Sequence, residues 1–600
     1  MGIVGMGTKM KRFIMLLLAV TFLAASGFLV EPLRYTQVKY DLTNAPVKGV
    51  APGVVLATTV LGAFRGIIVD IVWIRMESLK GEGKYFEIVQ LADLACRLAP
   101  NFPQVWDFNA WNMAYNVSVK LLDFNERWLW VKRGLEILRD QGIPNNANEP
   151  QLYFSLGMTY LHKVGGHDDN AHFVYKEGLG LEMHEALGGS GTQEDLQRFA
   201  NAPTLDEGLL EDPRVKEFCE RSVALGFDPL AEIPDERILR FFVWVRRPES
   251  IPQAAAELWQ AEENQYAVGK IADYARAKRL REQLHLEPQK MKALMDEFGP
   301  LDWRSPFPHA MYWATEGLRA AQTYKKHVAD RRRRHGIATP EYRTGADVIL
   351  YYPEFLYHDR DYDRIIYGAL DDLVTRGRLI YDGEGRILPM EAPDYRFTEK
   401  MIQYYEKVIA KYGDSALGPK GTVDSYGGFL KTVTIEFYYR GDEAKSRDYF
   451  KRLIQRFGGN ISYEEFIDNE LRNYIGGMGP AECRGLVQGL ISMYYFYLAC
   501  GDDEQASVLF TEAQNTVNMW QQKNDQNLDR LTVDLDMITD FALTEIFASR
   551  AGFAPEVIAR LEQRLPIAAV EKAKKTVAEQ EKLRELQPLR IPEERRWDPR

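Results

Sequence analysis

The amino-acid sequence predicts an all-α protein in which paired helices form an α-solenoid behind an N-terminal apolar segment. Few windows alternate apolar and polar residues, whereas many place apolar residues at positions i, i+3, i+4 and i+7, as in Ile88-Leu91-Ala92-Ala95-Leu98. The 600 residues are 46% hydrophobic and 27% charged, which suffices for a large buried core. Because each apolar stripe needs a neighbouring helix to cover it, we expect repeated helical hairpins.

The composition also argues against several classes of function. A net charge of −11 gives the chain no basic footprint for nucleic acid. The four cysteines, which form no CxxC pair, argue against a zinc ribbon, a redox motif and a disulfide scaffold. GxSxG, Walker and GxGxxG motifs are absent. We therefore expect no cofactor, no metal and no enzymatic activity.

The N-terminal segment has the pattern of a membrane anchor. Residues 1–12 form a basic tail, and residues 13–30 are free of charge and mostly apolar, at the lower length for a bilayer-spanning helix. Ala24 and Ser26 have the small-residue spacing of a signal-peptide cleavage site, and a buried helix is a third alternative. Because the apolar run continues to Val30, we favour an uncleaved transmembrane or signal-anchor helix.

Basic residues flank the anchor in equal number, so the positive-inside count is a tie. The short tail favours an N-inside orientation, with the bulk of the chain outside the cytoplasm. A second apolar stretch, residues 50–74, contains Arg65 and Asp70, each of which would cost ~2.5–3.5 kcal/mol at a helix centre in lipid. We interpret it as a largely buried helix that opens the folded part.

Four segments resemble tetratricopeptide (TPR) repeats, which are helical hairpins of about 34 residues. They have a glycine turn, an aromatic residue and a small residue at the spacing at which these helices cross. The residues that carry the resemblance in the three clearer segments are Gly83, Tyr85, Ala95 and Pro100; Tyr153, Leu156, Gly157 and Tyr160; and Gly501, Ala506, Phe510 and Ala513. The fourth and weaker segment has its turn at Gly441.

Residues 61–118, 126–143, 152–166 and 295–313 further resemble a group of uncharacterised bacterial membrane-anchored TPR-like proteins. This resemblance implies a single-pass protein of the bacterial inner membrane with a periplasmic, degenerate TPR-like α-solenoid. It brings no catalytic residue with it.

Changes in composition divide the rest of the chain. We expect N-terminal TPR-like repeats over 50–187, an irregular helical middle region over 188–395, C-terminal repeats over 396–565, and a charged helix with a frayed tail over 566–600. A glycine-rich loop is predicted from Gly188 to Pro203, and a long helical pattern follows over 254–284. A β-hairpin is predicted near 379–381 and 386–388.

Three polar clusters permit a functional interpretation beside a structural one. His162, His167 and His172 with Asp168 and Asp169 suggest metal ligands, but their five-residue steps favour a polar turn between helices. The alternate acids of 358–363 suggest a calcium loop, but the loop lacks the central glycine, which favours a solvated turn or structural ion pairs. The basic run 331–334 fits anionic lipid, an acidic partner or an ordinary helix end.

Tryptophans are dense near residue 106, and helical packing and a binding groove both account for them. Asn109, Asn112 and Asn116 share one helix face beside Trp106. Asparagine amides both donate and accept, so this stripe suits a peptide backbone, the alternative being a solvated helix face. We assign these four residues to a partner-binding groove.

The sequence thus predicts a non-catalytic, membrane-anchored helical-repeat scaffold that binds a partner protein or peptide at the membrane surface. One alternative is an all-α toroid enzyme acting on polysaccharide, which would enclose two facing carboxylates. A second alternative is a structural envelope protein that self-associates. The membrane is the other expected partner, and no nucleic acid is expected.

Overall fold

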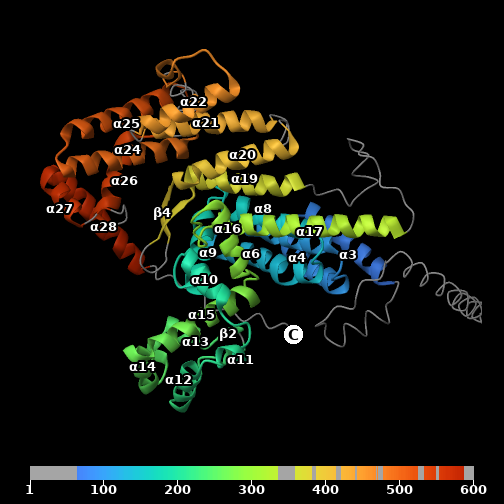
Figure 1. The fold of residues 1–600 in the computed structure, drawn as a ribbon. Coiled ribbons are helices and arrows are strands. Elements are labelled where there is room, and N and C mark those ends of the chain that lie inside the picture. The colour runs from blue at the N-terminus through green and yellow to red at the C-terminus, as the bar shows by residue number, and fades with distance from the viewer. Residues whose placement is uncertain are drawn as a thin grey trace, which may run out of the picture. The chain divides into compact units, whose positions relative to one another are not determined.

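The structure, a computed structural model, consists almost entirely of helices and confirms the all-α class (Figure 1). It describes residues 64–334 except 235, 359–381, 387–413, 421–439, 442–467, 469, 477–523, 533–548, 553 and 555–586. The chain forms two compact units, Met1–Thr422 and Val423–Arg600. No helix within the described ranges combines the length and apolarity needed to cross a membrane. The predicted anchor, residues 13–30, lies outside them.

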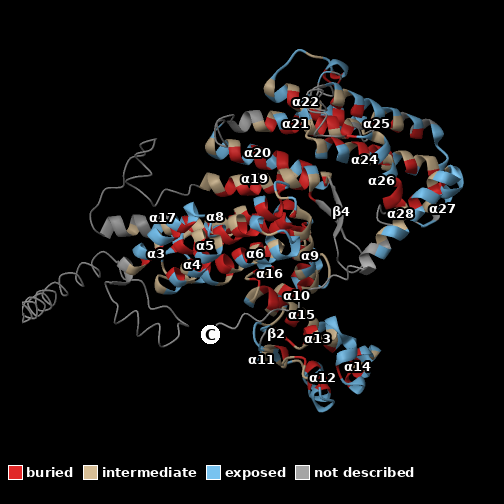
Figure 2. Ribbon diagram, turned by 180° about the vertical axis from the view of Figure 1, so that it is seen from behind, coloured by how far each residue is buried: buried red, intermediate tan, exposed pale blue. Residues whose placement is uncertain are grey.

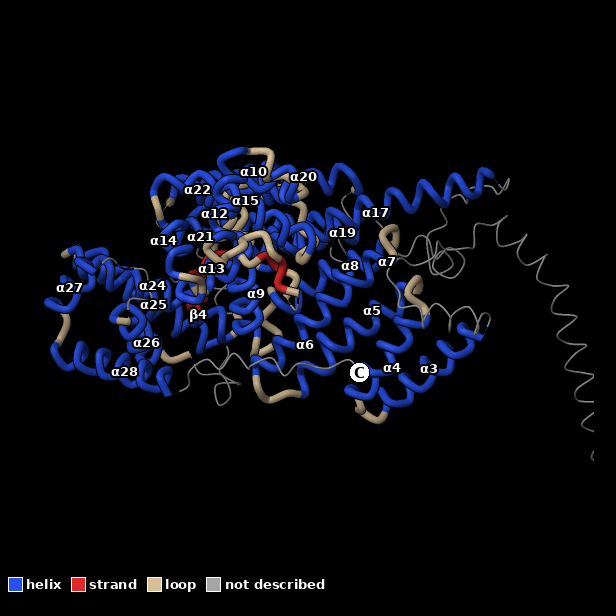
Figure 3. The backbone as a smooth tube through the Cα atoms, turned by 90° about the horizontal axis from the view of Figure 1, so that it is seen from below, coloured by secondary structure: helices blue, strands red, loops and turns tan. Residues whose placement is uncertain are grey.

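The first unit begins with a row of helices that lie side by side (Figure 3). These elements are α3 (Phe64–Gly81), α4 (Tyr85–Leu98), α5 (Pro103–Trp111), η1 (Asn112–Val117), η2 (Ser118–Lys120), α6 (Phe124–Glu136), η3 (Ile137–Gly142), α7 (Ile143–Asn145), α8 (Pro150–Met158), η4 (Thr159–Val164) and α9 (His172–Leu187). Helix α3 buries Val69, Val72, Met76 and Leu79, but Ile71 and Ile74 are exposed, so the part of residues 50–74 that the structure describes is only partly buried. The solenoid arrangement stays a prediction.

Two of these helices are built alike. Helix α5 begins with Pro103 and α8 with Pro150, and proline is favoured at the first helical position because its missing N–H is unpaired there anyway. Each α-helix runs for nine residues and continues as a six-residue π-helix, η1 or η4. The two prolines are 47 residues apart, a longer unit than the ~34 residues of a TPR consensus.

The middle region folds around Trp259, whose ring meets those of Phe218 and Phe227 at 5.2 and 5.5 Å. Its elements are α10 (Gln193–Asn201), α11 (Asp206–Leu209), α12 (Pro213–Ala224), β1 (Glu232–Ile233), β2 (Ile238–Leu239), α13 (Phe241–Arg246), η5 (Pro248–Ser250), α14 (Gln253–Gln260), η6 (Glu262–Asn264), α15 (Gln265–Glu282) and α16 (Pro288–Phe298). Strands β1 and β2 pair antiparallel, with Ile233 opposite Ile238.

Two predictions for this region need correction. The loop predicted from Gly188 to Pro203 contains helix α10, because Thr192 and Asp195 form a capping box that starts a helix directly after the glycines. The long helical pattern over 254–284 is divided between α14 and α15 by the short turn η6.

The first unit ends with α17 (Pro306–Arg334), α19 (Asp359–Arg376), β3 (Arg378–Tyr381), β4 (Ile387–Ala392), η8 (Tyr395–Phe397) and α20 (Thr398–Tyr412). Strands β3 and β4 form an antiparallel hairpin, which confirms the predicted one. Helix α17 packs on α8 and α19 (Figure 1). Buried residues gather where these helices face one another, and exposed residues cover their outer sides (Figure 2).

The second unit is also helical. It contains α21 (Gly421–Tyr439), α22 (Glu443–Phe457), α24 (Pro480–Cys500), α25 (Asp503–Lys523), α26 (Leu535–Phe547), α27 (Pro555–Arg564) and α28 (Ile567–Leu586). Its core surrounds Trp520, which is fully buried and donates its indole N–H to Met478 O at 2.8 Å. Gly501 ends α24 with a φ of 83°, a left-handed conformation that glycine adopts without strain.

Candidate functional site

A cavity of about 1080 Å³ lies between the two alike helices of the first unit. One wall is formed by α5 and η1, and the other by α8 and η4. Helices α3 and α6 and the loop before α9 contribute further lining residues. The residues that line it are Trp73, Gln104, Asp107, Phe108, Trp111, Tyr115, Val119, Arg127, Leu138, Gln151, Phe154, Ser155, Met158, Thr159, His162, Lys163, Asp168, Asp169 and Asn170.

The middle of the cavity is aromatic. The Trp73 and Phe108 rings meet at 5.0 Å, and the Trp111 and Tyr115 rings stack at 6.0 Å with an interplanar angle of 21°. The side chain of Trp111 is 44% exposed, although an indole of this size normally contributes to a core. The cavity therefore offers apolar ring surface to whatever enters it.

One end of the cavity contains the carboxylate of Asp107. Gln151, at the start of α8, donates its amide N–H to Asp107 Oδ2 over 2.6 Å. Burial raises the pKa of Asp107, and hydrogen bonds from Ser155 and Gln151 offset only part of this effect. No cation of the described part of the chain forms an ion pair with this carboxylate.

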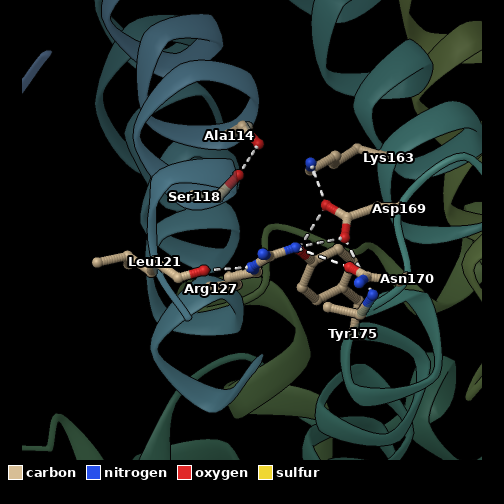
Figure 4. Close-up of polar contacts among 9 residues, drawn as sticks. Ala114, Ser118, Leu121, Arg127, Lys163, Asp169, Asn170 and Tyr175 are labelled. Carbon is tan, nitrogen blue, oxygen red and sulfur yellow. Dashed lines mark hydrogen bonds and ion pairs between the residues drawn. The ribbon is translucent and has the colours of Figure 1, made fainter. Parts of the chain in front are cut away.

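The opposite end is a charged cluster around Asp169, in the loop between η4 and α9 (Figure 4). Lys163 Nζ donates to Asp169 Oδ2 at 2.7 Å, and Tyr175 donates its hydroxyl to the same oxygen at 2.8 Å. Arg127 donates to Asp169 Oδ1 at 3.1 Å and to Asn170 Oδ1 at 2.8 Å. The cluster therefore joins α6, η4 and α9.

The donors of this cluster determine the charge of Asp169. Burial by itself would raise the pKa of the carboxyl, but hydrogen bonds from Lys163, the Ala171 amide and Tyr175 lower it to about 2. Burial and the bond to Asp169 together raise the pKa of Tyr175. At neutral pH the cluster therefore consists of one carboxylate, two cations and a neutral phenol.

The predicted groove residues lie elsewhere. Asn109 and Asn112 are fully buried, and their amides donate to Asp93 Oδ1 at 2.9 Å and to Tyr85 O at 3.4 Å. Trp106 is 5% exposed and donates its indole N–H to Pro100 O. Asn116 donates to Asn112 Oδ1 at 3.0 Å. The Asn109 and Asn112 amides thus fasten α5 and η1 to the chain before them, and the assignment of the stripe to a groove stays a prediction.

The repeat positions perform packing roles. Gly83 has a φ of 72° in the turn between α3 and α4, and a Cβ on Gly157 would lie 3.4 Å from Ala310 O of α17. Tyr153 donates its hydroxyl to Ala147 O, and Phe510 meets the Tyr494 ring at 5.2 Å. The buried members of the set are Ala95, Leu156, Gly157, Tyr160, Ala506 and Ala513. Tyr85 and Pro100 are partly exposed.

The other polar clusters belong to the fold. Within the described ranges, no three histidine, cysteine or acidic side chains meet as a metal site would require. Asp363 is buried in α19 and accepts hydrogen bonds from Tyr404 and Lys411 at 2.7 and 2.9 Å, as the ion-pair interpretation expected. His358 lies outside the described residues, and the run 331–334 is the end of α17.

The cavity residues were not predicted because they lie on a face of α5 and η1 next to the asparagine face that was assigned to a groove. On α5 the cavity face follows Gln104, Asp107, Trp111 and Tyr115, at steps of three and four residues. One signal was available: both helices begin with Pro-Gln, and Gln104 and Gln151 both line the cavity. The sequence gives no sign that Lys163 and Arg127 converge on Asp169.

Comparison of the chain with protein-family models, with curated proteins and with solved structures finds no match. The interpretation of the cavity therefore depends on its own residues.

Proposed function

We propose that the protein is a non-catalytic scaffold of the TPR-like α-solenoid type, which binds a segment of a partner protein in the cavity between α5–η1 and α8–η4. The observation that carries this proposal is the arrangement of the lining: two similarly built helices, separated in the sequence by α6, η3 and α7, each present one face to the same cavity. Helical-repeat proteins use such surfaces for extended ligands.

The chemistry of the cavity suits a peptide. Its volume exceeds the ~300–1,000 Å³ of most small-molecule sites. Exposed rings such as Trp111 supply anchors of the kind that dominate protein interfaces. The amides of Gln104 and Gln151 donate and accept hydrogen bonds, which suits a peptide backbone.

We further propose that residues 13–30 anchor the protein in a bacterial inner membrane, with the described helices in the periplasm. The support comes from the sequence alone, as a charge-free apolar run after a basic tail. The cavity would then present its partner at the membrane surface.

The polysaccharide-acting enzyme remains the second candidate, because the cavity contains Asp107 and Asp169 and their pKa values are shifted in opposite directions. Asp169, however, already accepts from Lys163, Tyr175, Arg127 and the Ala171 amide. Both of its oxygens are therefore occupied, and none is left to activate water or attack a sugar. This geometry favours the peptide-binding interpretation.

Site-specific photocrosslinking tests the proposal. A benzophenone amino acid replaces Trp111 in the full chain, in its native membrane, and a matched variant carries it at Leu205, which is 66% exposed and does not line the cavity. We expect irradiation to join one defined polypeptide to position 111 and not to position 205, and Phe154→Ala to reduce its yield.

Equal products from both positions, or products containing only this chain, would refute the scaffold. Release of sugar from a polysaccharide by the wild-type protein, abolished by Asp107→Asn, would establish the enzyme instead.

A further inference from the structure

Asp107 differs from the other carboxylate that is held inside the cavity. Asp169 has two cationic partners, Lys163 and Arg127, at 2.7 and 3.1 Å. Asp107 receives hydrogen bonds only from neutral groups, with Gln151 at 2.6 Å, and it is partly buried in the cavity lining. An ionised carboxylate in such a place is costly unless a cation accompanies it.

The rings beside Asp107 are suited to a cation. Trp111 lies one turn further along the same helix face. Phe108 and Phe154 also line the cavity. Two of the cavity's rings already have cations of the protein over them: Lys163 Nζ lies 5.4 Å from the Tyr115 centroid, and Lys80 Nζ lies 5.9 Å from that of Trp111.

The two ends of the cavity are separated along its walls. Asp107 and Tyr115 are eight residues apart on α5–η1, or ~12 Å at 1.5 Å per residue. The protein's own Lys163 contacts the Tyr115 ring at the far end. The near end thus has a carboxylate that no cation of the described residues pairs with, and the nearby Lys80 lies over the Trp111 ring instead.

We propose that the Asp107 end of the cavity binds a cationic side chain of the partner segment, with the carboxylate as its counter-ion and the rings of Trp111 and Phe108 along its alkyl stem. Lysine and arginine both combine an apolar stem with a cationic head. Both therefore match a site in which aromatic rings contact the stem and a carboxylate pairs with the head. The inference rests on the proposed function and adds the chemistry of the residue that the cavity recognises.

Small alkyl cations test the subsite on the full chain. The tryptophans are labelled with 5-fluorotryptophan, and the ¹⁹F resonance of Trp111 is assigned with Trp111→Phe. The probes are n-butylammonium, n-butylguanidinium and the uncharged n-butanol. We expect a saturable shift of the Trp111 resonance with the two cations and an affinity at least tenfold lower for n-butanol. The ratio between the two cations identifies the preferred head group.

Three variants localise the effect. Asp107→Asn should abolish the preference for cations, whereas Asp168→Asn removes the same charge from an exposed residue of the cavity lining and should retain it. Gln104→Lys, at an exposed position one turn before Asp107, should weaken n-butylammonium binding by supplying an internal competitor. Equal binding of n-butanol, or equal losses in Asp107→Asn and Asp168→Asn, would overturn the proposal.

The outcome is separable from that of the proposed function. A partner captured at position 111 whose lysines and arginines can be replaced by norleucine without loss of affinity would refute the cation subsite and leave the scaffold intact. Binding of n-butylammonium through Asp107 without any captured partner would support the subsite and count against the scaffold.

Discussion

Lys163 Nζ donates to Asp169 Oδ2 over 2.7 Å and thereby fastens η4 to the loop that leads into α9. Lys163 is a lysine with only 5% of its side chain exposed, and Arg127 reaches the same carboxylate from α6. Buried cations are tolerated when they are paired and hydrogen-bonded. Asp169 therefore keeps three helices of the cavity in register (Figure 4).

Asp169→Asn should destabilise the first unit by about 3–5 kcal/mol, because it leaves Lys163 buried without its counter-ion. Urea unfolding followed by tryptophan fluorescence measures the loss. The matched control is Asp168→Asn, an exposed neighbour that should change the free energy of unfolding by less than ~0.5 kcal/mol. Similar values for the two variants would show that the cluster contributes no net stability.

The same carboxylate predicts an acid limit. The pKa of Asp169 is lowered to about 2 in the folded state, against 3.8 as its ordinary value, so its contribution is complete above pH 4 and is lost as the pH falls to 2. Unfolding free energies measured between pH 5 and 2 should fall more steeply for the wild type than for Asp169→Asn. If the free energy of unfolding fell equally with pH in the wild type and in Asp169→Asn, the acid sensitivity would not come from Asp169.

Gly134 tests the packing that builds the cavity wall. A Cβ at this buried position of α6 would lie 2.8 Å from Ala110 O and 3.3 Å from Ala114 Cβ. Gly134→Ala should therefore cost about 1–3 kcal/mol through overpacking. The control is Gly269→Ala on α15, where a Cβ meets nothing within 4 Å and the change should stabilise the helix by ~0.5–1 kcal/mol. Urea unfolding of both variants should show a lower free energy of unfolding for Gly134→Ala and a higher one for Gly269→Ala.

The sequence predicted the elements better than the site. Periodic apolar stripes and the turn residues before β4 sufficed for the helices and the hairpin, because those signals are local. Burial of Asn109 and exposure of Trp111 depend on which face of α5 meets α4, and that choice is made by contacts distant in sequence. Helix α10 was not predicted because the glycines before it indicate a loop, whereas the capping box at Thr192 starts a helix directly after them.

His309 should make the first unit sensitive to mild acid. Its Nε2–H donates to Trp303 O at 2.9 Å, and burial lowers the pKa of the imidazole to about 4. The unfolded chain takes up this proton near pH 6.5, so stability falls as the pH drops from 6.5 to 4, by about 3 kcal/mol in total. His309→Gln can still donate to Trp303 O and should flatten this part of the stability curve. A variant curve as steep as that of the wild type would assign the acid sensitivity to other groups.

Binding of n-butylammonium should strengthen as the pH rises. The ligand needs Asp107 ionised, and burial raises the pKa of this carboxyl, so part of the protein is protonated above the usual carboxyl range. The other ionisable groups of the lining are Tyr115, Arg127, His162, Lys163, Asp168 and Asp169. Of these, Asp169 has a pKa of about 2 and Tyr115 one of about 12, so neither changes charge between pH 4.5 and 8.

The titration is performed on His162→Gln, which removes the one histidine from the cavity lining. In this variant the affinity for n-butylammonium should rise from pH 4.5, level off once Asp107 is fully ionised, and show no such rise after Asp107→Asn is added. The affinity for n-butanol should stay constant throughout. A pH dependence that survives the loss of Asp107 would place the cation at another carboxylate of the cavity, such as Asp168.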